Sequence, residues 1–140
     1  MENTMHESWT KIIFKYFVHG LFFTFLITFL IIGFFFVAAW LVLVGGILGF
    51  IALGIGIIVL FGVANNLING AVWGDSMNWS ILALLIHGLG LFVGILIINC
   101  VIVLLPQLLF SGLITTLVTF IPACILDGRV CRSIAERWID

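Results

Sequence analysis

Residues 16–74 read YFVHGLFFTFLITFLIIGFFFVAAWLVLVGGILGFIALGIGIIVLFGVANNLINGAVWG and contain no Asp, Glu, Lys or Arg. A second uncharged stretch, residues 76–126, follows after the single acid Asp75. A helix crosses the hydrocarbon core of a bilayer with about 20 apolar residues, and both stretches are far longer. Only 8% of the residues are charged, against about 25% in soluble domains. The sequence therefore predicts an integral membrane protein.

The length of each uncharged stretch predicts a helical hairpin rather than one span. Helices satisfy their own backbone amides, which a span in lipid requires. A single helix over residues 16–68 would be about 80 Å long at 1.5 Å per residue, whereas the hydrocarbon core is roughly 30 Å thick. Gly45-Gly46 supplies a tight turn in the first stretch. Pro106-Gln107 does so in the second, because proline disfavours helix in the residue before it.

These turns predict an all-α integral membrane protein in which residues 1–140 form a single membrane domain. We expect four transmembrane helices, at residues 14–43, 47–69, 79–104 and 107–126. They pair into two tandem helical hairpins, at about 14–69 and 79–126. A loop at 70–78 joins the hairpins.

Both ends of the chain are expected to form short amphipathic helices. Thr4-Met5-His6-Glu7 fits a capping box. Asp127 is expected to cap a C-terminal amphipathic segment over residues 127–140, in which Val130, Ile134 and Trp138 recur on one face. Such helices lie on the membrane surface as anchors, and docking of a partner helix is the alternative.

Tryptophan and basic residues predict which side each end faces. Trp prefers the membrane–water interface, and the four-helix layout brings four tryptophans to one face: Trp9, Trp73, Trp79 and Trp138. Trp40 lies at the other face. All five basic residues flank the first face. Because basic segments stay on the cytoplasmic side, we expect a multi-pass protein with both termini and the 70–78 loop in the cytoplasm.

A short pattern occurs twice along the chain. Trp9 precedes His19-Gly20-Leu21, and Trp79 precedes His87-Gly88-Leu89. Later in each half, Asn69-Gly70-Ala71-Val72 corresponds to Asp127-Gly128-Arg129-Val130. This order suggests an internal repeat of one helical hairpin in parallel orientation. Chance similarity is the alternative in a chain so rich in Leu, Ile and Gly.

Two histidines are the first candidates for chemistry. Ionisable side chains inside membrane segments mark functional sites by default, and His19 and His87 both fall in predicted spans. As a pair they would relay protons or bind a metal. Two His with no carboxylate or thiolate nearby make a poor metal site. We therefore expect each to bond a neighbouring helix, with the adjacent Gly allowing close approach.

Three asparagines are further polar candidates. Asn65 and Asn69 share a face at the predicted end of the second helix, where Asn followed by Gly70 is a common C-terminal signal. We expect them to finish that helix and meet water, with a vestibule or ion site as the alternative. Asn99 lies well inside the third predicted helix, and we expect it to bond across helices.

Small residues form stripes that predict close helix packing. The packing seams are Gly45, Gly49, Ala52 and Gly56 on the second predicted helix, and Gly90 and Gly94 on the third. Hydroxyl side chains extend the pattern on the other two helices, as Thr24 and Thr28, and as Ser111, Thr115 and Thr119. Because Ser and Thr also tolerate water, a pore lining is the alternative for them.

The sequence lacks the motifs of common catalytic sites. It has no His-Glu-x-x-His, no Gly-x-Ser-x-Gly and no phosphate loop. We therefore expect no enzyme activity, and no catalytic, cofactor-binding or metal-ligating residues. Beyond Lys15, at the edge of the first span, the predicted spans carry no Asp, Glu, Lys or Arg, which proton- and cation-coupled transporters usually need. A net charge of −1 offers no basic patch for nucleic acid.

These observations favour a small multi-pass membrane protein that acts through helix packing, as a self-associating unit or an accessory subunit of a membrane complex. Its expected partners are the lipid bilayer and other membrane helices, from a homo-oligomer or from different subunits, and not nucleic acid. One alternative is an oligomeric channel or passive carrier for a small solute, formed around the Ser/Thr stripes. A third hypothesis is a hairpin-type membrane-shaping protein.

Overall fold

The computed structural model describes residues 8–110 and 112–138. These residues are 92% helical and contain no β-strand. The elements are α1 (Trp9–Trp73), α2 (Ile81–Ile98), a π-helical segment η1 (Asn99–Leu104), α3 (Leu105–Leu109), α4 (Leu113–Ala135) and a 3-10 helix η2 (Glu136–Trp138). Within this described part, three helical stretches are long and apolar enough to cross a membrane: Trp9–Trp73, Ile81–Leu109 and Leu113–Ala135.

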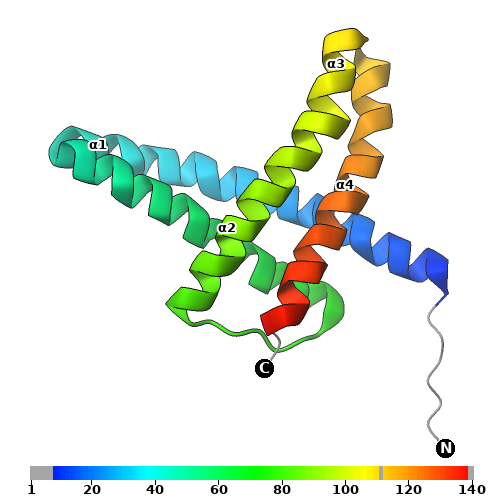
Figure 1. Cartoon of the computed structure of the whole chain (residues 1–140), viewed down its shortest axis with the longest axis horizontal. Coiled ribbons are helices and arrows are strands. Elements are labelled where there is room, and N and C mark those ends of the chain that lie inside the picture. Colours follow the sequence, from blue (N-terminus) through cyan, green and yellow to red (C-terminus); the bar gives the residue numbers. More distant parts are fainter. Residues whose placement is uncertain (1–7, 111, 139–140) are drawn as a thin grey trace, which may run out of the picture.

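The chain reverses direction at Gly46, within α1 (Figure 1). Gly46 has φ 52° and ψ −126°, a backbone conformation that glycine adopts easily because it has no Cβ. The reversal divides α1 into a first arm, residues 9–45, and a second arm, residues 47–73. The two arms run side by side, and the ring centroids of Phe23 and Phe61 lie 5.7 Å apart. These arms are the first helix pair.

The second helix pair consists of α2, η1 and α3, which follow one another as one rod, and α4, which runs back beside them (Figure 1). The turn predicted at Pro106-Gln107 is wrong, because the chain reverses between Leu109 and Leu113. Pro106 lies within this rod, directly after the π-helical segment η1, so the missing N–H of the proline falls where the regular α-helical bonding is already interrupted. Gln107 Nε2 donates to Thr116 Oγ1 on α4 over 2.6 Å, so it pairs across the turn instead of forming it.

The end of α1 also differs from the sequence prediction. The helix continues past Asn69 to Trp73, and its C-cap is Gly74, which has φ 77°. The Gly74 N–H donates to the Gly70 carbonyl oxygen over 3.0 Å. A left-handed glycine is a common helix end, so the connecting loop begins at Gly74 and not at residue 70. After the loop, the Ser80 hydroxyl caps α2 by accepting from Ala83 N over 3.2 Å.

Among the described residues, neither end of the chain forms a helix separate from the adjoining long helix. α4 runs through Asp127 without a break to Ala135, so the separate segment predicted at 127–140 is wrong in this respect. Asp127 is therefore a mid-helix residue and not an N-cap. The first arm likewise begins at Trp9 and continues into the predicted first span. The predicted capping box at Thr4 lies outside the described residues.

The first arm crosses α4 at a contact between two glycines. A Cβ on Gly20 would overlap the carbonyl oxygen of Cys124, and a Cβ on Gly128 would overlap that of Tyr16. Cys124 lies four residues before Gly128 on α4, and Tyr16 lies four residues before Gly20 on the first arm. Both backbones are therefore in direct contact, which only glycine permits.

The second arm crosses α2 in the same way. A Cβ on Gly62 would overlap the carbonyl oxygen of Leu84, and a Cβ on Gly88 would overlap that of Ile58. Here too, each carbonyl lies four residues before the glycine of its own helix: Leu84 before Gly88, and Ile58 before Gly62. Two glycine crossings thus hold the first helix pair against the second.

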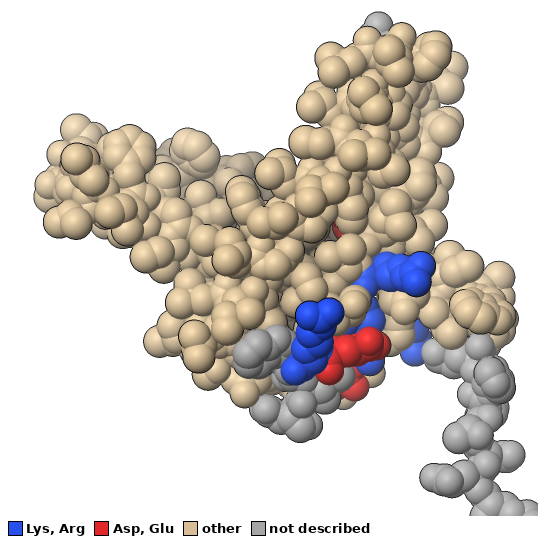
Figure 2. Space-filling model, viewed as in Figure 1, with Lys and Arg blue, Asp and Glu red and all other residues tan. Residues whose placement is uncertain are grey.

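The buried apolar residues lie close to these crossings. The core cluster includes Phe23, Phe61, Ala64, Leu91 and Cys131. Away from the crossings the two helix pairs diverge (Figure 1), and most of their large apolar side chains are exposed. Charged side chains gather at one end of the molecule, where the start of α1, the loop after α1 and the end of α4 meet (Figure 2). The molecule therefore has a packed, charged end and two uncharged, apolar tips.

Candidate functional site

A cluster of polar side chains connects both arms of α1, the loop after it and α4. We call this cluster the polar junction: His19, Asn65, Asn69, Trp73, Asp75 and Arg132. His19, Asn65 and Asn69 are fully buried. Buried polar groups need hydrogen-bond partners to offset their lost hydration, and each of these three has at least one.

His19 lies in the middle of a directed chain of hydrogen bonds. The indole Nε1–H of Trp73 donates to His19 Nδ1 over 3.0 Å. Because Nδ1 accepts, the ring proton of the neutral imidazole is on Nε2, and Nε2 donates to Asn65 Oδ1 over 3.0 Å. Asn65 Nδ2 then donates to the Cys131 carbonyl oxygen over 3.2 Å. The chain links the first arm to the second arm and the second arm to α4.

Arg132 is the second connector of the polar junction. Its guanidinium forms an ion pair with Asp75 in the loop and donates to Asn69 Oδ1 over 3.0 Å. Its Nε donates to Glu136, one turn later at the start of η2, over 3.0 Å. Arginine has several donors in a planar fork, so one side chain joins α4 to the second arm and to the loop. Asp75 therefore links the loop after α1 to α4.

The Trp73 ring packs against one aromatic ring and two cationic side chains at this end. Its centroid lies 5.4 Å from that of Tyr16 on the first arm. Lys15 Nζ lies 5.1 Å from the ring centroid and Arg132 Cζ lies 4.6 Å from it, both within cation–π range. The same residue therefore contributes a hydrogen bond to His19 and a ring face for two cations.

The asparagines of the second arm do not end the helix as the sequence predicts. Asn65, Asn66 and Asn69 are buried, because α1 continues for another turn and places them against other elements. Asn66 Nδ2 donates to the Asn78 carbonyl oxygen over 3.0 Å, and Asn69 Nδ2 donates to Met77 Sδ over 2.9 Å. They hold the loop against α1 and do not meet water.

His87 lies outside the polar junction, on α2 next to the crossing at Gly88, and is fully buried. Both ring nitrogens of His19 are engaged by Trp73 and Asn65, so the two histidines do not bond to each other. Across residues 8–110 and 112–138, no group of three or more His, Cys, Asp or Glu is arranged to hold a metal ion. The geometry gives the hypothesis of a histidine pair no support.

Asp127 and Asn99 form a second buried polar contact, on the second helix pair. Asp127 is 3% exposed, and its Oδ2 lies 3.4 Å from Asn99 Nδ2, which also donates to the Ile95 carbonyl oxygen over 2.9 Å. Asp127 Oδ1 has no hydrogen-bond partner in the described part of the chain. Asn99 is the first residue of η1, and π-helical segments are frequent at functional sites.

Sequence alone does not identify Asp127 as a site residue, because Asp followed by Gly predicts the start of a surface helix. A signal for the correct placement was present. Ala123, Asp127, Cys131 and Ala135 recur every four residues, and all four are buried on one face of α4. A similar signal marks Trp73, which continues the stripe of Asn65 and Asn69. In both cases, residues at four-residue spacing continue along one helix face past the position where the local sequence predicts a helix boundary.

The predicted packing seams divide into used and unused positions. Gly49 faces the backbone of Leu41 and Gly56 faces the ring of Phe34, so both allow the two arms to approach. Gly45 and Ala52 are exposed. A Cβ on Gly90 would meet the Ile134 side chain at 3.4 Å, and one on Gly94 would meet Val130 at 3.0 Å, so α2 and α4 pack through side chains there.

The chemistry that this arrangement supports is hydrogen bonding and ion pairing between helices. The hydroxyls of Thr24, Thr28 and Thr119 donate to carbonyl oxygens of their own helices, and Ser111 lies outside the described residues. The polar side chains that are brought together hold elements to one another. In comparisons with known proteins, no family model, no curated protein and no solved structure matches this chain.

Proposed function

We propose that this protein is a non-enzymatic, multi-pass membrane protein that acts through helix packing, as a self-associating unit or an accessory subunit of a membrane complex. One observation carries the proposal: the polar side chains are used to join the helix pairs at one end, whereas the tips diverge and expose apolar faces. Such faces in a membrane associate by close packing of small residues.

The tip of the first helix pair has the features of such a packing surface. A hollow of about 480 Å³ lies between residues that include Trp40, Gly45 and Ala52. A Cβ on Gly33, Gly45 or Gly54 would meet nothing within 4 Å, so these glycines leave room that their own chain does not fill. Open glycine positions let a second backbone approach closely, and a helix of a second protein is the occupant that we propose.

We further propose that the two helix pairs are the two hairpins of a four-span layout. Each arm of α1, the α2–α3 rod and α4 is long enough for a crossing of about 20 residues. The charged side chains gather where the loop, the start of α1 and the end of α4 meet (Figure 2). The positive-inside rule then favours a cytoplasmic location for this end.

The two glycine crossings support an internal repeat. Gly20 and Gly88 follow His19 and His87, and each meets a glycine of the other helix pair with the same four-residue relation. The partner glycines are Gly128 and Gly62. The repeat that we propose therefore aligns Gly62 with Gly128, in place of the Gly70 that the sequence pattern suggests.

Cysteine labelling tests the four-span layout. Gly45→Cys, in a Cys100→Ser background, is expected to react with a membrane-impermeant maleimide added on the side opposite the termini, because each arm crosses the bilayer. Trp79→Cys in the same background is the control and is expected to react from the side of the termini. Protection of residue 45 from both sides would contradict spanning hairpins and would favour the membrane-shaping hypothesis.

Native mass spectrometry in mild detergent tests the packing function. The wild-type protein is expected as an oligomer or with a co-purifying membrane subunit. Ala52→Trp, which fills the hollow at the tip, is expected to reduce that assembly. Ile51→Trp places the same indole side chain at the neighbouring exposed position and is expected to retain the assembly. A wild-type protein that is monomeric and alone would contradict the proposal.

The contact between Asp127 and Asn99 favours a second candidate, an oligomeric channel or passive carrier for a small solute. A buried carboxyl group inside an apolar helix is a default functional candidate, and one oxygen of Asp127 has no partner among the described residues. Proton or solute flux into liposomes that Asp127→Asn abolishes would favour this candidate. Flux equal to that of protein-free liposomes would exclude it.

A further inference from the structure

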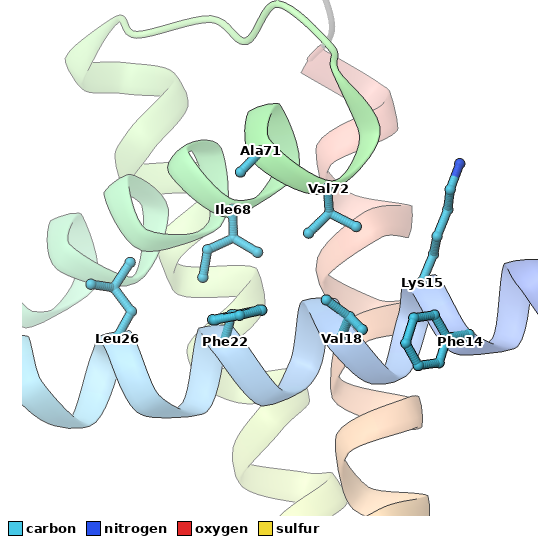
Figure 3. A pocket seen from close by; sticks show the side chains of 8 residues that line it. All are labelled: Phe14, Lys15, Val18, Phe22, Leu26, Ile68, Ala71 and Val72. Carbon is cyan, nitrogen blue, oxygen red and sulfur yellow. The ribbon is translucent and has the colours of Figure 1, made fainter.

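An apolar groove of about 520 Å³ runs between the two arms of α1 at their charged end (Figure 3). Its walls are formed by Phe14, Val18, Phe22 and Leu26 on the first arm and by Ile68 and Val72 on the second. Figure 3 shows these side chains facing one another across the groove, with Lys15 rising at one end. Lys15 is the charged member of this lining.

The length of the groove matches one leaflet of a bilayer. From Phe14 to Leu26 the first arm rises about 18 Å at 1.5 Å per residue. Half of the hydrocarbon core is about 15 Å. The wall along this length is aromatic and aliphatic, so it offers an acyl chain dispersion contacts and no hydrogen-bonding group.

The two lysines of the first arm lie together at the charged end of the groove. A second hollow, of about 600 Å³, adjoins the first and is lined by Thr10, Lys11, Phe14 and Lys15. Phe14 and Lys15 line both hollows. Among the described residues no Asp or Glu lines either one. An apolar trough that ends at two cations is complementary to a lipid with a negatively charged headgroup.

Arg132, the other basic group nearby, belongs to the polar junction. Arg132 is paired with Asp75 and Glu136. Lys15 lies over the Trp73 ring, which keeps its stem near the groove. Lys11 is exposed. The two lysines that line the hollows therefore both belong to the first arm.

We propose that this groove binds one phospholipid, with an acyl chain between the two arms and an anionic headgroup at Lys11 and Lys15. The inference rests on the proposed placement of α1 in a membrane, and it adds a lipid partner to that placement. The lipid would fill the space that α1 leaves between its arms at the leaflet into which the charged end inserts.

Native mass spectrometry of the full chain tests the proposal with two lipids of identical acyl chains, phosphatidylglycerol and phosphatidylcholine. The wild type is expected to retain phosphatidylglycerol preferentially. The double variant Lys11→Gln/Lys15→Gln is expected to lose about fivefold of that preference per lysine, because a basic residue near an anionic surface contributes about this factor. Arg129→Gln/Arg137→Gln removes the same charge from exposed positions on α4 and η2 and is expected to keep the preference.

A groove-filling variant tests whether the acyl chain occupies the groove. Ala71→Trp, at a lining position of the second arm, is expected to lower retention of both lipids, with an unchanged thermal unfolding midpoint showing that the fold is intact. Glycerol 3-phosphate, a free headgroup without an acyl chain, is expected not to displace the lipid. Equal retention of the two lipids by the wild type, or an unchanged preference in the lysine double variant, would overturn the proposal.

These readouts are separate from those of the packing function. Lipid retention by a monomeric protein would contradict the proposed self-association or subunit role and leave the lipid site in place. An assembled protein that retains both lipids equally would contradict the lipid site and leave the packing function in place.

Discussion

The charged end of the molecule and its two tips are built from the same apolar residues but are organised differently. At the charged end, glycines bring backbones into contact, and polar side chains connect both arms of α1, the loop after it and α4. At the tips, the helices diverge and large side chains such as Phe36, Leu43 and Leu113 are exposed. In a membrane, apolar residues alone do not drive helices together, because lipid tails are equally apolar. The comparison shows that small and polar residues decide where helices meet.

The largest expected effect is at a glycine crossing. Gly128→Val would place side-chain atoms where the backbone of the first arm lies, and overpacking of this kind costs about 3 kcal/mol or more when backbone must move. Gly33→Val, at a position where a Cβ meets nothing within 4 Å, is the matched change at a tip and is expected to stay within about 0.5 kcal/mol.

Unfolding of the two variants in mixed detergent with SDS, followed by tryptophan fluorescence, measures this difference. Equal loss of stability in both variants would mean that the crossing and the tip are equally packed, and it would contradict the comparison.

The second effect is at the middle of the hydrogen-bond chain. His19→Ala leaves the Trp73 indole N–H and the Asn65 carbonyl oxygen without their partner. An unsatisfied buried group costs about 1–3 kcal/mol, and the smaller mean for polar contacts in membranes, about 0.6 kcal/mol, places the expected loss near the lower limit. Ile32→Ala, an exposed position on the same arm, controls for truncation. A stability equal to wild type would show that the chain of bonds contributes nothing.

The third effect is at the ion pair that ties the loop to α4. Arg132→Gln removes the bonds to Asp75 and Glu136, and the Asp75 side chain is 26% exposed. Partly exposed ion pairs contribute about 0–1 kcal/mol, so the change in global stability is expected to be small. Amide hydrogen exchange in the loop around Met77 is the sensitive measurement, and it is expected to rise. Arg129→Gln, an exposed change on the same helix, is expected to leave it unchanged.

The smallest effect is expected at the buried acid. Asp127→Asn keeps the shape and the contact with Asn99 but removes a charge that burial opposes. We expect a change within about 1 kcal/mol, toward higher stability, in the same unfolding assay. Asp127→Ala, which leaves a cavity at the same position, is the control and is expected to be less stable than Asp127→Asn. A clear loss of stability in Asp127→Asn would show that the carboxylate has a partner that the amide cannot replace.

Much of the helical architecture follows from local sequence. The uncharged stretches predict apolar helices, and Gly46 adopts a positive φ within the glycine pair where a turn is predicted. The second turn could not be placed this way, because Pro106 lies inside the continuous α2–α3 rod, directly after η1. A proline signals a helix boundary, and whether the boundary is a reversal depends on the helix that packs alongside.

The candidate site was predicted in parts. His19, Asn65, Asn69 and Asn99 are polar residues in apolar helices and therefore stand out in the sequence. Their partners do not, because Asp75 and Arg132 lie in segments that look like ordinary charged ends. The interhelical bonds connect residues as far apart as Asn65 and Cys131, and no local pattern specifies such a distance.

The sequence by itself determined that the chain is helical, apolar and made of segments that fold back, because hydropathy and glycine placement act over a few helical turns. The tertiary structure alone decided which helices cross and which polar groups meet. Gly20 and Gly62 look like any other glycines of the chain until the backbones of α4 and α2 lie against them. Asp127 looked like a helix start and is a buried side chain. The physical reason is that lipid accepts every apolar face alike, so only close packing and satisfied polar groups select one arrangement of the helices.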